Sequence, residues 1–120
     1  VQIEASRSLL HRAALSAGHN GSPFPDATLA AQGKIFTSEM ALKVTTDALQ
    51  VYGARGYSRN YPMERLARDA RMFTIGGGTA QILRTVVASR ILDRKLPQTR
   101  EGFTKLAEQA EQAARLQAAE

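Results

Sequence analysis

The glycine-rich segment of residues 73–84, FTIGGGTAQILR, holds the residues whose types and spacing best suit chemistry in this chain. Three consecutive glycines precede Thr79 and an apolar-periodic segment. The first N–H groups of a helix have no partner within the helix and lie at the positive end of its dipole, so they suit a carbonyl oxygen, a phosphate or a flavin edge. Glycines allow such a ligand to approach the backbone closely. The segment is a candidate ligand site, and a flexible turn between two helices is the alternative interpretation.

Other candidates for catalysis are few. His11 lies in a predicted helix and His19 in a loop, and neither has another metal ligand near it in the sequence, so we interpret both as surface or capping residues. Glu64 and Asp69 lie among arginines, and ion pairs along one helix face are the favoured interpretation for them. The chain has no cysteine, which excludes disulfides and thiolate metal ligands. We therefore predict no catalytic residue and no metal site within this chain.

The spacing of apolar residues predicts helices almost throughout the chain. A loop rich in Gly and Pro, residues 16–25, precedes Asp26, whose side chain is a candidate N-cap. Gly33 lies inside the longest predicted helix, which indicates that a neighbouring segment approaches closely there. Residues 53–62 break this helix. The predicted helices span residues 1–16, 26–52, 63–71, 79 to the stop at Leu96–Pro97, and 101–119.

Only one run, residues 71–75, resembles a strand. A single strand cannot satisfy its backbone hydrogen-bonding groups, and the sequence offers no second strand to pair with it. The fold class is therefore predicted to be all-α, and the glycine-rich segment does not belong to a dinucleotide-binding sheet.

Composition limits the remaining classes of function. Of 120 residues, 43% are hydrophobic, which is enough for a packed core and makes a wholly disordered chain an unfavoured interpretation. The net charge of +5 permits an acidic partner, but the basic residues are dispersed and aromatic residues are scarce, so nucleic-acid binding is the weakest interpretation. No apolar run has the length of a membrane span, and no secretory leader is recognisable, which together favour a cytoplasmic location.

Four motifs in order resemble the C-terminal signature of the acyl-CoA dehydrogenase family. That signature runs Q-x-x-G-G-x-G-Y, Y-P-x-E-R/K, R-D-A-R/K and I-x-E/G-G-T-x-E/Q-I. The matching stretches are QVYGARGY from Gln50, YPMER from Tyr61, RDAR from Arg68 and IGGGTAQI from Ile75. The upstream helix also fits at Ala31, Lys34, Ser38 and Glu39. The resemblance covers roughly residues 1–93, so we expect a partial bundle domain over 1–93 and a separate Ala/Gln/Glu-rich helical tail over 94–120.

The resemblance implies an FAD-dependent oxidoreductase of fatty acid metabolism. Its C-terminal domain is an up-and-down four-helix bundle that forms homodimers and homotetramers, and this chain would supply the bundle without its first helix. The implied substrate is an acyl-CoA, oxidised to the 2-enoyl-CoA, and the implied partner is an electron-transferring flavoprotein. By position, the implied FAD contacts are Gln50 and Gly53 across the dimer interface and Thr79 and Gln81 at the last long helix, while Gly77 and Gly78 would line the thioester pocket.

Two positions depart from the family pattern. Ala54 replaces a glycine, which is a mild change. Gly77 occupies the position where many members have the glutamate that removes the α-proton, and glycine cannot act as a base. Isovaleryl- and long-chain-type members have a small residue here and carry the glutamate on the preceding bundle helix. We therefore expect this chain to resemble that type, to lack a base of its own and to be inactive alone.

Two alternatives stay open at this point. Flavin monooxygenases and oxidases of the same fold share the signature, and Gly77 is compatible with them. A non-catalytic helical module that self-associates is the second alternative.

Overall fold

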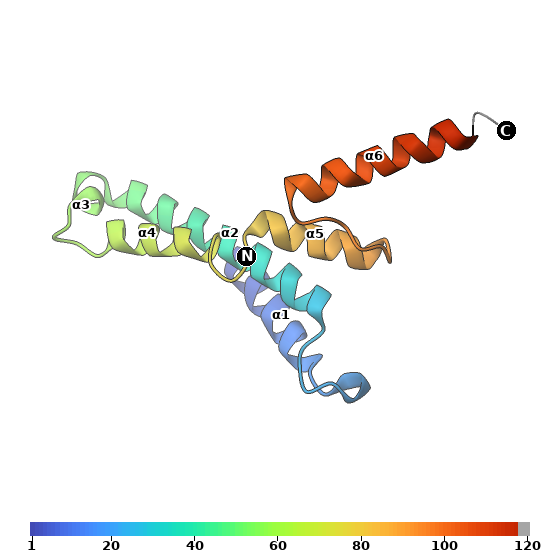
Figure 1. The fold of residues 1–120 in the computed structure, drawn as a ribbon. Helices are drawn as coiled ribbons and strands as arrows, with labels where there is room; N and C mark the ends of the chain where they lie inside the picture. Colours follow the sequence, from blue (N-terminus) through green and yellow to red (C-terminus); the bar gives the residue numbers. More distant parts are fainter. Residues whose placement is uncertain (118–120) are drawn as a thin grey trace.

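A computed structural model describes residues 1–117, which form helices and connecting segments with no strand among them (Figure 1). The all-α prediction is therefore confirmed. A short 3-10 turn, His19–Gly21, follows the first helix. The α-helices are α1 (Gln2–Leu15), α2 (Ala27–Tyr52), α3 (Ala54–Tyr57), α4 (Met63–Phe73), α5 (Ala80–Ile91) and α6 (Arg100–Gln117).

Helix α2 is the centre of the arrangement (Figure 1). Helices α1, α3, α4 and α5 each pack against it, and α3 also contacts α4. Among the described residues, α6 packs against no other helix, and it extends away from α5 in Figure 1. The position of the glycine-rich segment is thus set by two helices, α4 and α5, that share α2 as their support.

The ends of α2 follow from local chemistry. The Asp26 side chain accepts a hydrogen bond from the Leu29 N–H at 2.8 Å, which confirms the predicted N-cap. At the other end Gly53 adopts φ +59°, a conformation that favours glycine, and the helix stops there. The predicted break of residues 53–62 does contain the four-residue helix α3, because the chain resumes a single turn directly after Gly53.

Gly33 lies where α1 crosses α2, as the sequence predicts. A methyl group at this position would lie 3.7 Å from Leu10 Cδ2 and 3.9 Å from the carbonyl oxygen of Leu9. The two helices therefore approach closely at Gly33, yet they leave room for one methyl group.

The hydrophobic content of the sequence allows a packed core, but few side chains are buried in the described part of the chain. The buried hydrophobic residues in the described part are alanines, and no large side chain there is fully buried. The radius of gyration is 20.1 Å, whereas a compact domain of this length has a radius of about 14 Å. The helices spread along α2 instead of enclosing a common centre, so the apolar side chains stay partly exposed.

Helix α5 shows the same effect. Its apolar stripe predicts a helix buried in a bundle, but Ile91 is 72% exposed. An open apolar groove of about 550 Å³ remains between α1, α2 and α5, with Leu9, Phe36 and Val87 in its walls. The helix also ends at Ile91 rather than near Leu96, since the chain turns back and the Leu96 N–H donates to Ser89 Oγ at 3.0 Å.

The last predicted helix, residues 101–119, is confirmed over most of its length as α6. Residues 118 and 119 lie outside the described part. Its apolar Phe103 is 48% exposed.

Candidate functional site

The turn between α4 and α5 is formed by the three glycines. Gly77 has φ +67° and Gly78 has φ +90°, both in the left-handed region that favours glycine. Neither of their N–H groups donates to another backbone group or side chain among residues 1–117. The turn therefore presents free N–H donors on residues that have no side chain of their own, which suits an oxygen acceptor on a ligand.

The start of α5 is fixed directly after this turn. Thr79 is the N-cap, and its Oγ1 accepts from the Ile82 N–H at 3.2 Å. The Ala80 N–H donates across the turn to the Thr74 carbonyl at 3.1 Å. Because Thr79 Oγ1 acts as the acceptor in its cap, its hydroxyl hydrogen stays available for a ligand.

Two polar links join this region to α2. Lys34 Nζ donates to the Gly78 carbonyl at 2.6 Å. Arg84 of α5 forms two hydrogen bonds to Glu39 of α2, at 2.7 and 2.8 Å. These charged bonds connect the turn and the first turns of α5 to the long helix.

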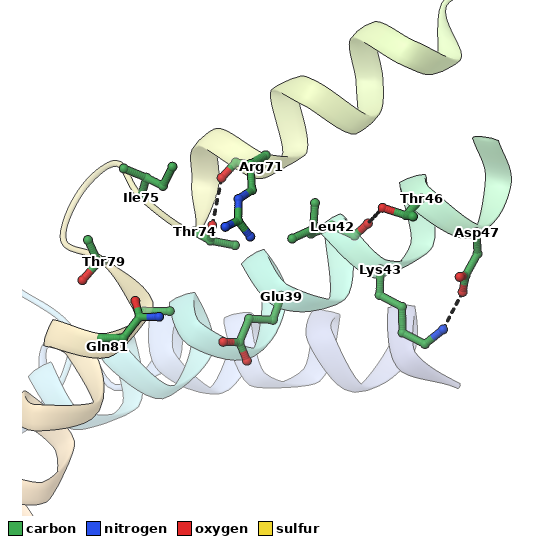
Figure 2. Close-up of a pocket in the computed structure, with 11 residues that line it drawn as sticks. Glu39, Leu42, Lys43, Thr46, Asp47, Arg71, Thr74, Ile75, Thr79 and Gln81 are labelled. Atoms are coloured by element: carbon green, nitrogen blue, oxygen red, sulfur yellow. Dashed lines mark hydrogen bonds and ion pairs between the residues drawn. The ribbon is translucent and has the colours of Figure 1, made fainter. Parts of the chain in front are cut away.

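A cavity of about 400 Å³ lies between α2, the end of α4 and the start of α5. Figure 2 shows the Arg71 guanidinium and the Gln81 amide directed toward the space beside Glu39, with Thr79 near its rim. Of its charged residues, Glu39 is paired with Arg84, and Lys43 pairs with Asp47 at 2.5 Å. Arg71 has no carboxylate within ion-pair distance in the part of the chain that the structure describes, so the cavity has one unpaired cation. The lining residues are Glu39, Leu42, Lys43, Thr46, Asp47, Arg71, Thr74, Ile75, Thr79, Ala80 and Gln81.

The structure brings together only some of the residues that the sequence singles out. Thr79 and Gln81 share the cavity, whereas Gly77 and Gly78 lie in the adjoining turn and do not line it. Gln50 and Gly53 lie near the far end of α2, and both are exposed. Gln50 is three residues beyond Asp47 and so continues the same face of α2 by about one helical turn.

Three cavity residues were missed as a group by the sequence analysis: Glu39, Lys43 and Arg71. The sequence does contain a pattern that indicates Glu39 and Lys43. Together with Asp47 they recur at four-residue spacing, which places them along one face of α2. For Arg71 the sequence offers only its place in the RDAR motif, and the packing of α4 on α2 turns its side chain toward that face.

The remaining candidates do not form a second site. His11 and His19 line one shallow hollow, but no group of three potential metal ligands exists among residues 1–117. Glu64 pairs with Arg68 at 3.7 Å, which confirms the ion-pair interpretation for Glu64. None of the described helices is long and apolar enough to cross a membrane.

Comparison with known proteins shows which family the chain belongs to. Residues 1–92 match the family model described as acyl-CoA dehydrogenase, C-terminal domain. The chain belongs to the acyl-CoA dehydrogenase family, which confirms the resemblance carried by the four motifs. The fold agrees as well, since butyryl-CoA dehydrogenase from Megasphaera elsdenii superposes with a TM-score of 0.68 and 40% identity over 76% of this chain and 23% of that one.

Two similar proteins are named for different reactions. A 3-sulfinopropanoyl-CoA desulfinase from Advenella mimigardefordensis is 63% identical over 108 residues, which cover 90% of this chain and 26% of that protein. A cyclohexane-1-carbonyl-CoA dehydrogenase from Geobacter metallireducens is 44% identical over 91 residues, covering 76% of this chain and 23% of that protein. The chain thus spans about a quarter of the length of the curated relatives it matches.

Proposed function

We propose that this chain is the C-terminal part of an FAD-containing enzyme that acts on an acyl-CoA thioester. The observation that carries the proposal is the turn of Gly77 and Gly78, with its free N–H groups, joined to the capped start of α5. Membership of the acyl-CoA dehydrogenase family supports it.

In this proposal the chain supplies edge contacts to FAD rather than the whole binding site. Thr79 retains a hydroxyl hydrogen, and the Gln81 amide faces the cavity of about 400 Å³, so both suit the polar edge of a flavin. Gln50 and Gly53 are exposed near the end of α2. They suit contacts with the FAD of a neighbouring subunit in a homodimer or homotetramer.

Gly77 and Gly78 line the thioester pocket in this proposal. Their N–H groups donate to the thioester carbonyl oxygen, which orients the thioester in either candidate reaction and stabilises the negative charge that grows there when a proton leaves the α-carbon. Donors that are already oriented stabilise such charge most effectively, because little reorganisation is needed during the reaction.

The reaction proposed first is desulfination of a 3-sulfinoacyl-CoA. The relative that is 63% identical is named for this reaction, and Gly77 carries no carboxylate. In balanced form, the carbon–sulfur bond breaks, the carbon gains a hydrogen from water, and the sulfur leaves as sulfite with the oxygen of that water. The α-hydrogens stay in the product, so this reaction needs no glutamate at position 77 and no external electron acceptor.

Dehydrogenation to the 2-enoyl-CoA is the second candidate, supported by the dehydrogenase that is 44% identical. Bound FAD would accept the hydride from the β-carbon, and an electron-transferring flavoprotein would be the partner. The α-proton would then need a base outside residues 76–78, since these are glycines.

The test uses the full-length flavoprotein that carries this chain. It is incubated with 3-sulfinopropanoyl-CoA and, separately, with butanoyl-CoA and an artificial electron acceptor. One sulfite per thioester consumed, without acceptor reduction, is the expected result. Acceptor reduction with butanoyl-CoA and no sulfite favours the second candidate, and a protein without FAD and without either activity refutes the proposal. The 120-residue chain alone is expected to show no turnover.

A further inference from the structure

Lys34 makes an unusual contact with the glycine turn. Its Nζ lies 2.6 Å from the Gly78 carbonyl oxygen, and the two residues are 44 positions apart in the sequence. The other backbone bonds of the turn are local, such as Gly76 N–H to the Met72 carbonyl at 2.8 Å. Lys34 is therefore the polar contact that ties the turn itself to α2.

The Gly78 carbonyl matters because it belongs to the same rigid peptide unit as the Thr79 N–H. In a trans peptide the C=O and N–H groups point in opposite directions. When Lys34 holds the carbonyl oxygen on the α2 side, the Thr79 N–H is turned to the opposite side. This N–H has no acceptor among residues 1–117.

Glycines make this orientation easy to lose. Gly77 and Gly78 both have positive φ, and residues without Cβ reach several other conformations at low cost. Without Lys34, no hydrogen bond among residues 1–117 joins the peptide unit between Gly78 and Thr79 to α2. The ammonium group thus limits a flexible segment to one arrangement.

The contact of Lys34 differs in kind from the nearby ion pair of Arg84 and Glu39. Arg84 and Glu39 already join α5 to α2 through two charged hydrogen bonds. Lys34 has no carboxylate within ion-pair distance among the described residues, and its charge is directed at a carbonyl dipole instead. The bonds between Arg84 and Glu39 therefore join α5 to α2, whereas the Lys34 hydrogen bond fixes the glycine turn.

We propose that Lys34 is a positioning residue, which fixes the peptide unit between Gly78 and Thr79 and thereby aims the free Thr79 N–H at the ligand. This inference rests on the proposed function, in which the glycine turn faces the thioester. In this inference α2 helps to orient the oxygen acceptor of the ligand through Lys34, although Lys34 itself does not contact the substrate.

The test compares Lys34→Met, Lys34→Arg and wild type in the full-length flavoprotein, with Lys105→Met on α6 as the matched control. Lys105 is likewise a lysine in a charged contact, with Glu101 at 2.8 Å, but within residues 1–117 its helix, α6, packs against no other helix. The first readout is hydrogen exchange at the Ala80 and Ile82 amides, whose bonds depend on the turn. The second is kcat and KM, both expressed per bound FAD.

Loss of one charge-assisted hydrogen bond at an exposed contact predicts exchange about two- to fivefold faster in Lys34→Met, and a similar fall in kcat with KM nearly unchanged. Lys34→Arg, which keeps a cationic donor, should restore most of both. Lys34→Gln, with a shorter neutral donor, replaces Lys34→Met if the latter does not fold.

Exchange at Ala80 and Ile82 that equals wild type, or an equal change in Lys105→Met, overturns the inference. A lower kcat that Lys34→Arg does not restore also counts against it. If the wild-type flavoprotein converts no acyl-CoA, the proposed function fails instead, and the exchange measurement still decides whether Lys34 holds the turn.

Discussion

Replacing Gly77 with alanine isolates the cost of the backbone conformation at the candidate site. Gly77 has φ +67°, and a Cβ added there would meet nothing within 4 Å. Steric clash with neighbours is thus absent, and only the left-handed backbone opposes the substitution. That conformation costs an L-residue roughly 1–2 kcal/mol, and the lower entropy of the unfolded chain offsets about 0.4–1 kcal/mol of this cost. We expect Gly77→Ala to lower the free energy of unfolding by about 1 kcal/mol.

The assay is urea unfolding of the 120-residue chain, followed by circular dichroism at a helix band. Gly77→Asn is the matched variant, because asparagine tolerates the left-handed region better than alanine. Its loss of stability should be clearly smaller, at about half of that of alanine or less. If Gly77→Ala unfolds at the wild-type midpoint, or if the two variants lose equal stability, the backbone explanation for this glycine is refuted.

Three further substitutions test the helix contacts. Gly33→Ala should raise the free energy of unfolding by about 0.5–1 kcal/mol, since the new methyl group lies at 3.7 Å from Leu10; a lower urea midpoint would show that the crossing of α1 and α2 is tighter than described. Thr79→Val should lower stability by about 1 kcal/mol through loss of the N-cap bond to Ile82, and Thr79→Ser should retain it; equal losses in both would exclude the cap as the cause. Ser6→Ala should raise the thermal midpoint slightly, because the Ser6 hydroxyl is buried without a partner among the described residues; destabilisation by this change would indicate an acceptor for that hydroxyl.

The local structure of this protein could be predicted well from its sequence. Helix periods, the Asp26 cap and the stop at Gly53 depend on interactions within a few residues, so the sequence is sufficient to predict them. The same holds for Thr79, where a residue that favours the N-cap position follows three glycines. The assignment of residues 94–120 as a separate tail stays a prediction.

The site could be predicted only in part. Thr79 and Gln81 were identified through the family motif, and the structure places both at one cavity. Their roles, and those of Gln50, Gly53, Gly77 and Gly78, stay predictions until ligand binding is measured. Arg71 belongs to the RDAR motif, but its place in the cavity could not be predicted from the sequence, since the direction of its side chain depends on how α4 packs along α2.

Short-range patterns are enough to predict the all-α class, the family and the glycine turn. The contacts of Lys34 with Gly78 and of Glu39 with Arg84, by contrast, depend on the tertiary arrangement of the helices. These pairs are 44 and 45 residues apart, and their contact requires α5 to fold back onto α2. The tertiary structure also decided that a chain rich in hydrophobic residues buries mainly alanines. The physical reason is that burial depends on how many helices surround a side chain, and here most helices have α2 as their one extensive partner.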